Sequence, residues 1–476
     1  MPDNFIALYD VTGIQKYIFS TSRLKDIIGA SILVGRALSD VMEDIMKGVM
    51  KDFGASSQEA VIFSGGGNAI VRFPDHKAWK QFNSVFSRKL LLEMPGITFA
   101  TVYNEAIDDS DSVDKRVSDL FSKMASTKAL GGNNCEIGTL PPMAQCGPDN
   151  QPVCYISKEQ DRRTGEDSQL GEYLSAATAA KRDVWDNWSK RVKGVSRKNI
   201  PITFDEIAKK PESIENAERF MAVVHLDGNQ MGKMFKDVCE KAEKFDEISA
   251  FSRDIDMAYN KAMQSVLSFI EEKSSKRIRL IYADGDDVTY VCHCVYALDS
   301  VMEFMKTLQE FRPASVGGQQ SFSACAGIAY VKPKFPFYRA FEIAKARCRS
   351  AKQLAHERLQ EQFVDDEDIG CWVDFEVVRG SGGSEISREM FKRPYRIGSH
   401  EKDDKYSITK LCNELGDIRE WPRSSSKGLR NAYLTGDDDS LHAIAGRMKS
   451  KGRDVKLDER EHLFDALDIA DLEVLV

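Results

Sequence analysis

The sequence contains no Cys-x-x-Cys pair, no apolar run long enough to cross a bilayer and no excess of positive charge. Its ten cysteines are scattered, so a zinc ribbon is not supported, although Cys135, Cys146 and Cys154 are close enough to form a degenerate metal knuckle. The formal net charge of −8 argues against a protein coated with positive charge for duplex DNA, but is compatible with a local basic groove. The N-terminus, "MPDNFIALYDVTG", has no basic segment followed by an apolar one, so no signal peptide is expected. These features predict a soluble, cytoplasmic protein of several domains with reduced thiols.

A β-α-β-β-α-β pattern occurs twice along the chain. The first copy consists of a strand at 5–10, a long helical pattern at 13–46, a glycine-linked hairpin at 60–73, a helix ending near 92 and a strand at 97–106. The second consists of a strand and helix start at 219–235, a helix at 251–272, a hairpin at 278–292, a helix at 297–311, a strand at 321–333 and a helix at 337–355. Two ferredoxin-like repeats are the economical explanation.

This pattern predicts an α+β fold in which the two repeats pack pseudo-symmetrically. The predicted domains are a first repeat over 1–130, a loop and helical insert over 131–215, a second repeat over 216–365 and a C-terminal helical domain over 366–476. The insert ends in a basic run, Lys190–Lys198, which is more often a solvated face than a nucleic-acid site. "RGSGGSE" (379–385) is typical of a flexible linker, and "GDDDS" (436–440) of an interhelical turn with an N-cap.

Three acidic residues of the second repeat are expected to meet in space. Asp227 ends the first strand in "HLDGN", and Asp286 and Asp287 lie at the turn of the hairpin "LIYADGDDVTYV". The first strand lies beside the central hairpin in this topology, so we expect the carboxylates to lie at one sheet edge. Like charges held close together cost stability unless a cation lies between them. Oxygen ligands favour Mg²⁺ or Mn²⁺, and a pair of such ions suits phosphoryl transfer. The alternative is a plain Asp-Gly hairpin turn with solvated acids.

Other residues of the second repeat could bind a triphosphate. The segment "GNQMGKMF" turns from strand into helix, so its free N–H groups could cradle phosphates, and Gly228 and Gly232 would allow close approach. Lys345 and Lys352 lie on one face of the last helix and either are solvated or reach the phosphates. His225 and His293 lie on strands beside the acids and are more typical of core or edge histidines than of ligands.

The hairpin of the first repeat lacks acidic side chains. It reads Gly65-Gly66-Gly67-Asn68, so it offers no carboxylate for a metal, although its glycines would let a nucleotide lie against the backbone. This contrast predicts one catalytic and one binding repeat.

These motifs resemble, in order, those of the catalytic palm domain in the large polymerase subunit of type III CRISPR effector complexes. The resembling stretches are "FMAVVHLDGNQMGKMF", "LIYADGDDVTYV" and "FSACAGIAYVKPKFPFYRAFEIAKARCRSAK" in the second repeat, and "DVTGIQKYIFSTSRLKDIIGAS" and "SGGGNAIVRF" in the first. The palms are more distantly similar to GGDEF diguanylate cyclases.

The resemblance implies synthesis of cyclic oligoadenylates from ATP, by attack of a 3′-hydroxyl on an α-phosphate with release of pyrophosphate. It implies that Asp227, Asp286 and Asp287 are catalytic metal ligands. It also implies triphosphate contacts by Gly228, Asn229, Gly285 and Lys352. Other subunits of the effector, a guide or target RNA, or a second copy of the chain are the implied partners, and no membrane is involved.

Two features depart from the family. The hairpin usually reads Gly-Gly-Asp-Asp, whereas here Asp284 replaces the first glycine and leaves the product class open. No His-Asp pair precedes the first repeat, so we expect no HD nuclease domain and a reduced polymerase that could work alone. A non-catalytic RNA-binding scaffold and a cyclase that uses GTP are the alternatives.

Overall fold

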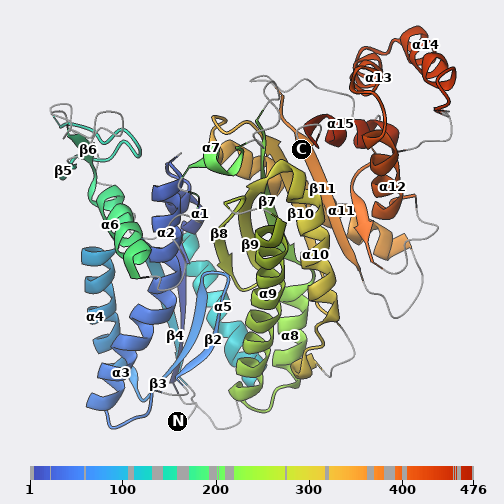
Figure 1. Ribbon diagram of the computed structural model, residues 1–476. Helices are drawn as coiled ribbons and strands as arrows, with labels where there is room; N and C mark the ends of the chain where they lie inside the picture. The colour runs from blue at the N-terminus through green and yellow to red at the C-terminus, as the bar shows by residue number, and fades with distance from the viewer. Residues whose placement is uncertain are drawn as a thin grey trace.

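The computed structural model describes residues 5–21, 23–57, 60–105, 112–130, 143–157, 171–191, 201, 203–209, 219–273, 276–316, 321–361, 369–379, 392–398, 405–453, 455, 457 and 462–473. These residues form an α+β fold with two main sheets that are flanked by helices (Figure 1).

The first sheet has the strand order β2-β3-β1-β4. Its strands are β1 (Phe5–Thr12), β2 (Val61–Gly65), β3 (Asn68–Phe73) and β4 (Thr98–Glu105), which confirms the predicted strand and hairpin positions. Side chains alternate along β1. Phe5, Ala7 and Tyr9 join one apolar cluster with the helices before β2 and after β3, whereas Ile6 and Leu8 join a second cluster with the helix that follows β4.

The long helical pattern predicted at 13–46 is interrupted. The structure has α1 (Ile14–Ile18), α2 (Leu24–Arg36), a short π-helical turn η1 (Ala37–Val41) and α3 (Met42–Asp52). Between α1 and α2, Ser20 donates to the Tyr17 carbonyl and the Thr21 hydroxyl accepts from the Arg23 N–H. Such side-chain bonds to the backbone compete with helix hydrogen bonds, which explains the break.

The second sheet has the strand order β12-β11-β10-β7-β9-β8. Its strands are β7 (Met221–Gly228), β8 (Ile278–Asp284), β9 (Asp287–His293), β10 (Ala324–Val331), β11 (Cys371–Val377) and β12 (Tyr395–Ile397). The segment predicted as helical from residue 366 therefore begins with two strands that lengthen this sheet. The alternation in "CWVDFEV" is the period-two signal for β11.

The remaining helices cover both sheets and connect them. They are α4 (His76–Glu93), α5 (Val113–Ala129), α8 (Met231–Lys241), α9 (Phe245–Lys273), α10 (Ala297–Glu310) and α11 (Phe337–Glu361). Helix α9 bridges the two sheets, because Ser252 bonds to both backbone groups of Ser64 on β2 (Figure 1). Each of the two large apolar clusters contains residues of both sheets, so the two repeats pack together in both clusters.

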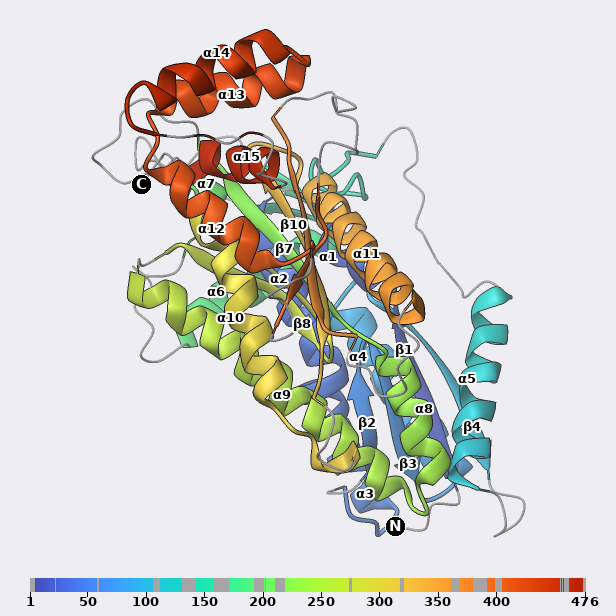
Figure 2. The ribbon, with the colours of Figure 1, turned by 90° about the vertical axis from the view of Figure 1, so that its right-hand side faces the viewer.

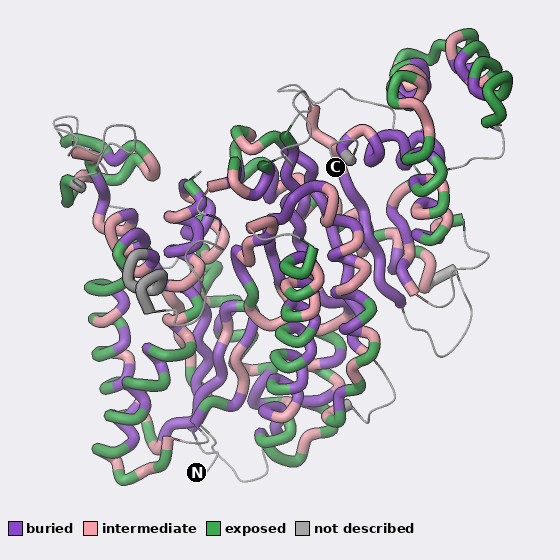
Figure 3. Tube along the Cα trace, in the orientation of Figure 1, coloured by how far each residue is buried: buried purple, intermediate pink, exposed green. Residues whose placement is uncertain are grey.

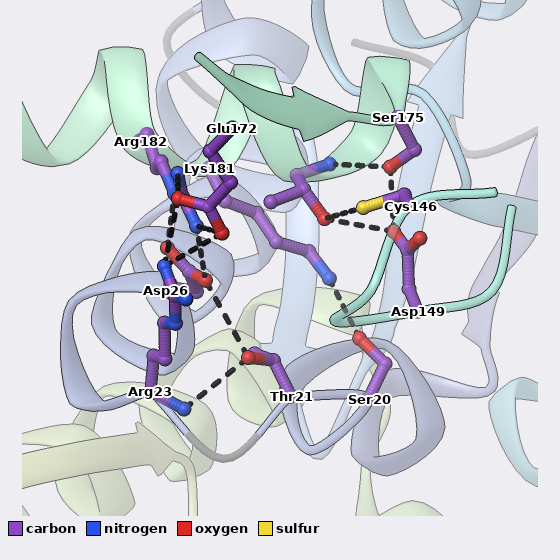
Figure 4. A network of polar contacts seen from close by, with 11 residues as sticks. Ser20, Thr21, Arg23, Asp26, Cys146, Asp149, Glu172, Ser175, Lys181 and Arg182 are labelled. Atoms are coloured by element: carbon purple, nitrogen blue, oxygen red, sulfur yellow. Dashed lines mark hydrogen bonds and ion pairs between the residues drawn. The ribbon is translucent and has the colours of Figure 1, made fainter. Parts of the chain in front are cut away.

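The insert is joined to α2 by a network of charged side chains. It contains β5 (Tyr155–Ser157), β6 (Glu172–Leu174) and α6 (Ala176–Arg191), and α7 (Phe204–Ile207) follows. Arg182 on α6 donates to Asp26 and to Glu172, and Lys181 donates to the Tyr17 carbonyl and to the Ser20 hydroxyl (Figure 4). These contacts hold α6 against the first repeat.

The C-terminal helices are α12 (Ile408–Arg419), α13 (Arg423–Thr435), α14 (Asp438–Lys449) and α15 (Leu463–Glu473). The α13–α14 pair lies at the end of the molecule away from the N-terminus and exposes much of its surface (Figures 2 and 3). Asp437 caps α14 by accepting from the Ser440 N–H, which confirms the N-cap predicted for 436–440.

Several predictions lie outside the described residues. These are most of the linker at 379–385, most of the basic run Lys190–Lys198, and Cys135 of the candidate knuckle. Cys146 is buried and Cys154 is exposed, and neither is in a disulfide. None of the described helices is both long enough and apolar enough to cross a membrane.

Candidate active site

The three predicted carboxylates lie at one end of the second sheet. In the β7–β9 pairing Asp227 is opposite Asp287, and in the β8–β9 pairing Asp284 is opposite the same residue. Asp286 lies in the turn between β8 and β9. Residues directly opposite each other in antiparallel strands have neighbouring side chains. The sheet register therefore brings together acids that are far apart in sequence.

The turn lies one residue later than the sequence suggested. We expected Asp284-Gly285 at its centre, but Asp284 and Asp287 form the flanking pair, with Gly285 and Asp286 at the centre. Gly285 has a φ of 60°. A glycine with positive φ at the first central position is the pattern of a type II′ hairpin turn.

The carboxyl groups are in an environment that disfavours negative charge. Burial, and then the charge of Asp227, raise the pKa of Asp286 to about 6. Burial and the charges of Asp227, Asp286 and Asp284 raise the pKa of Asp287 to about 8. A cation beside these groups would lower both pKa values, because it favours the ionised form.

A lysine from the last helix of the second repeat contacts the first of these acids. Lys352 Nζ lies 2.6 Å from Asp227 Oδ2 and donates to the Gly228 carbonyl at 2.7 Å. The side chains of Lys352 and Asp227 are 25% and 40% exposed, so the lysine can move away when another anion arrives. Lys345 lies seven residues earlier on the same face of α11 and donates instead to Gln15 of the first repeat.

The site has the ligand chemistry for a divalent cation but is not preassembled for one. Among the residues that the structure describes, no group of three or more His, Cys, Asp or Glu side chains is placed to hold a metal ion as it stands. Lys352 occupies one oxygen of Asp227. Asp287 Oδ1 is buried and forms no hydrogen bond, although the neutral ring of His225 lies 3.4 Å away. A buried carboxylate oxygen without a donor is the kind of atom that a cation satisfies, so the residues fit Mg²⁺ or Mn²⁺.

Gly228 makes room for the turn that carries the acids. A Cβ on Gly228 would lie 2.8 Å from the Asp286 Cβ and 2.6 Å from the Tyr259 hydroxyl. Tyr259 on α9 is fully buried and its hydroxyl has no hydrogen-bond partner. Sequence reasoning missed Tyr259, because only the packing of α9 against β7 places it beside Asp286.

Asn229 is held inside the fold, and its predicted contact with a triphosphate stays a prediction. It is buried, its backbone N–H donates to the Ser323 carbonyl, and its side-chain amide donates to the Gly370 carbonyl. These bonds connect the end of β7 with the segments that precede β10 and β11. Gly232 lies in the first turn of α8, and no atom lies within 4 Å of a Cβ added to it.

The first repeat retains part of the same arrangement. Asp10 lies opposite Asn68 in the β1–β3 pairing, as Asp227 lies opposite Asp287. Lys128 Nζ on α5, the helix after β4, lies 2.5 Å from Asp10 Oδ2, just as Lys352 on the helix after β10 contacts Asp227. Sequence reasoning missed this pair, because neither residue lies in the glycine-rich hairpin.

The glycine turn of the first repeat is covered by the second repeat. A Cβ on Gly285 would lie 3.3 Å from the Gly66 nitrogen, and the Gly67 N–H donates to Asp284. The hairpin turn of the second repeat therefore lies against this backbone, and the contact of a nucleotide with Gly65, Gly66 and Gly67 stays a prediction. Asn68 donates to the Gly66 carbonyl within its own turn.

The two strand histidines are buried, as predicted for core positions. Burial lowers the pKa of His225 to about 4; the charge of Asp227 acts in the opposite direction, and nearby lysines and an arginine act in the same direction as burial. Burial and the charge of Arg277 lower the pKa of His293 to about 4 as well. Both rings are therefore neutral near pH 7.

Comparison with known proteins agrees with the resemblance seen in the sequence. Residues 220–360 match the family model described as Cas10/Cmr2, second palm domain. No curated protein matches the chain.

Solved structures with a similar fold include the Csm1–Csm4 cassette in several states. The apo cassette is 14% identical with a TM-score of 0.51, and the match covers 100% of this chain and 70% of that chain. The complex with pppApApA is 13% identical with a TM-score of 0.52 and the same coverage. The complex with cA4 is 14% identical with a TM-score of 0.50, again with the same coverage. At these identities the likeness concerns the fold. The resemblance predicted for the second repeat is thus confirmed, because residues 220–360 match the second palm domain of Cas10/Cmr2 and the described fold is similar to that of the Csm1–Csm4 cassette.

Proposed function

We propose that the chain is a metal-dependent nucleotidyltransferase that makes a cyclic oligonucleotide messenger, cyclic oligoadenylate from ATP, in CRISPR-type antiviral defence. The observation that carries this proposal is the meeting of Asp227, Asp286 and Asp287 at one end of a sheet that matches the second palm domain of Cas10/Cmr2. Similar folds bind cA4 and pppApApA in the Csm1–Csm4 cassette, which is consistent with adenine nucleotides as substrates here.

The acids are proposed as the ligands of Mg²⁺ or Mn²⁺. When bound, such ions activate an attacking hydroxyl and stabilise the charge on a leaving pyrophosphate. Asp287 Oδ1 has no competing hydrogen bond, and Asp286 extends from the turn, so both are available as ligands. Asp227 becomes available when Lys352 leaves it.

Lys352 is the proposed triphosphate contact. Its ammonium now bonds to Asp227 and to the Gly228 carbonyl, and a triphosphate would offer it stronger anionic partners. The open space at Gly232 and the free N–H groups at the start of α8 are the proposed surroundings of the same phosphates. Gly285 is proposed to lie beside them in the turn.

Both sheets contain the ferredoxin-like strand order, and we interpret them as two palms related by pseudo-symmetry. The first palm is proposed to bind the second nucleotide through the Lys128–Asp10 pair and Asn68, beside the covered glycine turn. Effector subunits, guide RNA or a second copy of the chain stay proposed partners, and the cytoplasm stays the proposed location.

The test is turnover of labelled NTPs by the purified protein with Mg²⁺ or Mn²⁺, followed by mass spectrometry of the products. The Asp286→Ala, Asp287→Ala double variant should lose at least about a thousandfold in rate, because bound metal supplies several kcal/mol of transition-state stabilisation. Glu271→Gln changes an exposed acid near the C-terminal end of α9 and is the matched control. If no NTP releases pyrophosphate, with or without RNA and partner proteins, the proposed function is wrong. If the double variant stays active, the site assignment is wrong.

A further inference from the structure

The two hairpin turns of the molecule contact each other directly. The Gly67 N–H in the β2–β3 turn donates to Asp284 Oδ2 at 2.5 Å, and the Tyr282 hydroxyl donates to the same oxygen at 3.1 Å. A hydrogen bond to an ionised acceptor is shorter and stronger than one between neutral groups. Asp284 thus connects two turns that are 217 positions apart in sequence.

The two turns approach each other at glycines. A Cβ on Gly65 would lie 3.7 Å from the Gly285 Cα, and a Cβ on Gly285 would lie 3.3 Å from the Gly66 nitrogen. The two turns therefore lie backbone against backbone, and a larger residue at Gly285 would press on the Gly66 nitrogen.

The strand registers of the two hairpins show that only the second repeat has an acidic residue at the position of Asp284. Asp284 flanks its turn opposite Asp287, as Gly65 flanks the other turn opposite Asn68. The first repeat therefore has a glycine where the second has a carboxylate. The bond between the turns is one-sided, with the second repeat as acceptor and the first as donor.

We propose that Asp284 is a positioning residue, which holds the turn with Asp286 and Asp287 at a set distance from the first repeat. This inference rests on the proposed function, because it concerns the alignment of the metal-binding acids with a nucleotide bound by the first repeat. Asp284 touches neither the substrate nor the metal. It acts through the β8–β9 turn, whose central residues are Gly285 and Asp286.

The first measurement reports on the contact itself and needs no turnover. Hydrogen–deuterium exchange at the Gly67 amide should accelerate by about tenfold or more in Asp284→Gly, since a charge-assisted bond is lost. Asp284→Asn keeps an acceptor oxygen and should lie between this variant and the wild type. Glu271→Gln, which removes an exposed acid near the C-terminal end of α9, should leave the Gly67 exchange unchanged. Thermal unfolding of each variant shows that it is folded.

The second measurement separates positioning from binding. In Asp284→Gly, kcat should fall by about tenfold while KM for the nucleotide changes less than about threefold, because a misplaced catalytic turn costs rate more than binding. Asp284→Asn should recover most of kcat.

The outcomes separate this inference from the proposed function. Unchanged Gly67 exchange in folded Asp284→Gly, or unchanged kcat in that variant, overturns the inference while the proposed function stands. If the wild type turns over no nucleotide, the proposed function fails, and the exchange result alone decides whether Asp284 holds the turns together.

Discussion

Replacing Gly327 by alanine should separate the last helix of the second repeat from its sheet. Gly327 lies in the middle of β10 and faces the backbone of α11. A Cβ at this position would lie 1.9 Å from the Ala344 carbonyl oxygen and 2.3 Å from the Cys348 nitrogen. Both atoms belong to the main chain, so no side-chain rotation can relieve the overlap.

The size of the displacement follows from these distances. Ordinary contact begins near 3.4 Å, so α11 has to move away by about 1.5 Å. Inserting a methyl group into a well-packed interior costs about 1–3 kcal/mol, and the rigid backbone here favours the upper end. The same helix carries Lys345 and Lys352, which contact Gln15 and Asp227, so the shift should also lower activity.

Denaturant unfolding and initial-rate measurements test this prediction. Gly446→Ala is the matched control, because no atom lies within 4 Å of its added Cβ and it lies in α14, outside the candidate site. Alanine there should leave stability unchanged or raise it by up to about 1 kcal/mol. A Gly327→Ala protein that is as stable as the wild type would refute the close packing of β10 on α11.

Two further predictions concern two lysines and a buried histidine. Lys128→Met should raise KM for the nucleotide more than it lowers kcat. Lys352→Met should both raise KM and lower kcat, because only Lys352 lies beside the proposed catalytic acids. Equal effects of the two variants in steady-state kinetics would contradict different roles for the two repeats. Burial lowers the pKa of His293 to about 4 in the folded protein, so below about pH 6.5 the unfolded chain binds a proton that the folded chain does not. The free energy of unfolding should therefore fall between about pH 6.5 and pH 4, by about 1.4 kcal/mol per pH unit. His293→Asn should flatten this dependence in denaturant titrations at several pH values; an unchanged slope would contradict the assignment.

Much of the site could be predicted, because the signals are local. The apolar alternation in "LIYADGDDVTYV" and the repeated order of elements place Asp286 and Asp287 at a hairpin, and the topology places that hairpin beside Asp227. Strand pairing has a period of two residues, so a correct topology already determines which side chains are neighbours.

Other features depend on contacts that no local pattern encodes. Asn229 lies two residues after Asp227, yet its side-chain amide donates to the Gly370 carbonyl inside the fold. The Lys128–Asp10 pair is recognised only when the registers of the two sheets are compared. Strands β11 and β12 lengthen the second sheet because the parallel partner of β11 is β10, on the far side of α11 in the chain.

The sequence by itself determined the two repeats, the three acids and the glycine turn, because period-two alternation, turn residues and charge are written along the chain. Only the tertiary structure decided how the two turns meet. Asp284 accepts from Gly67 across the two repeats, and Lys352 contacts Asp227. The physical reason is that hydrogen bonds and ion pairs depend on distances of a few ångströms, which packing sets between residues that the sequence holds far apart.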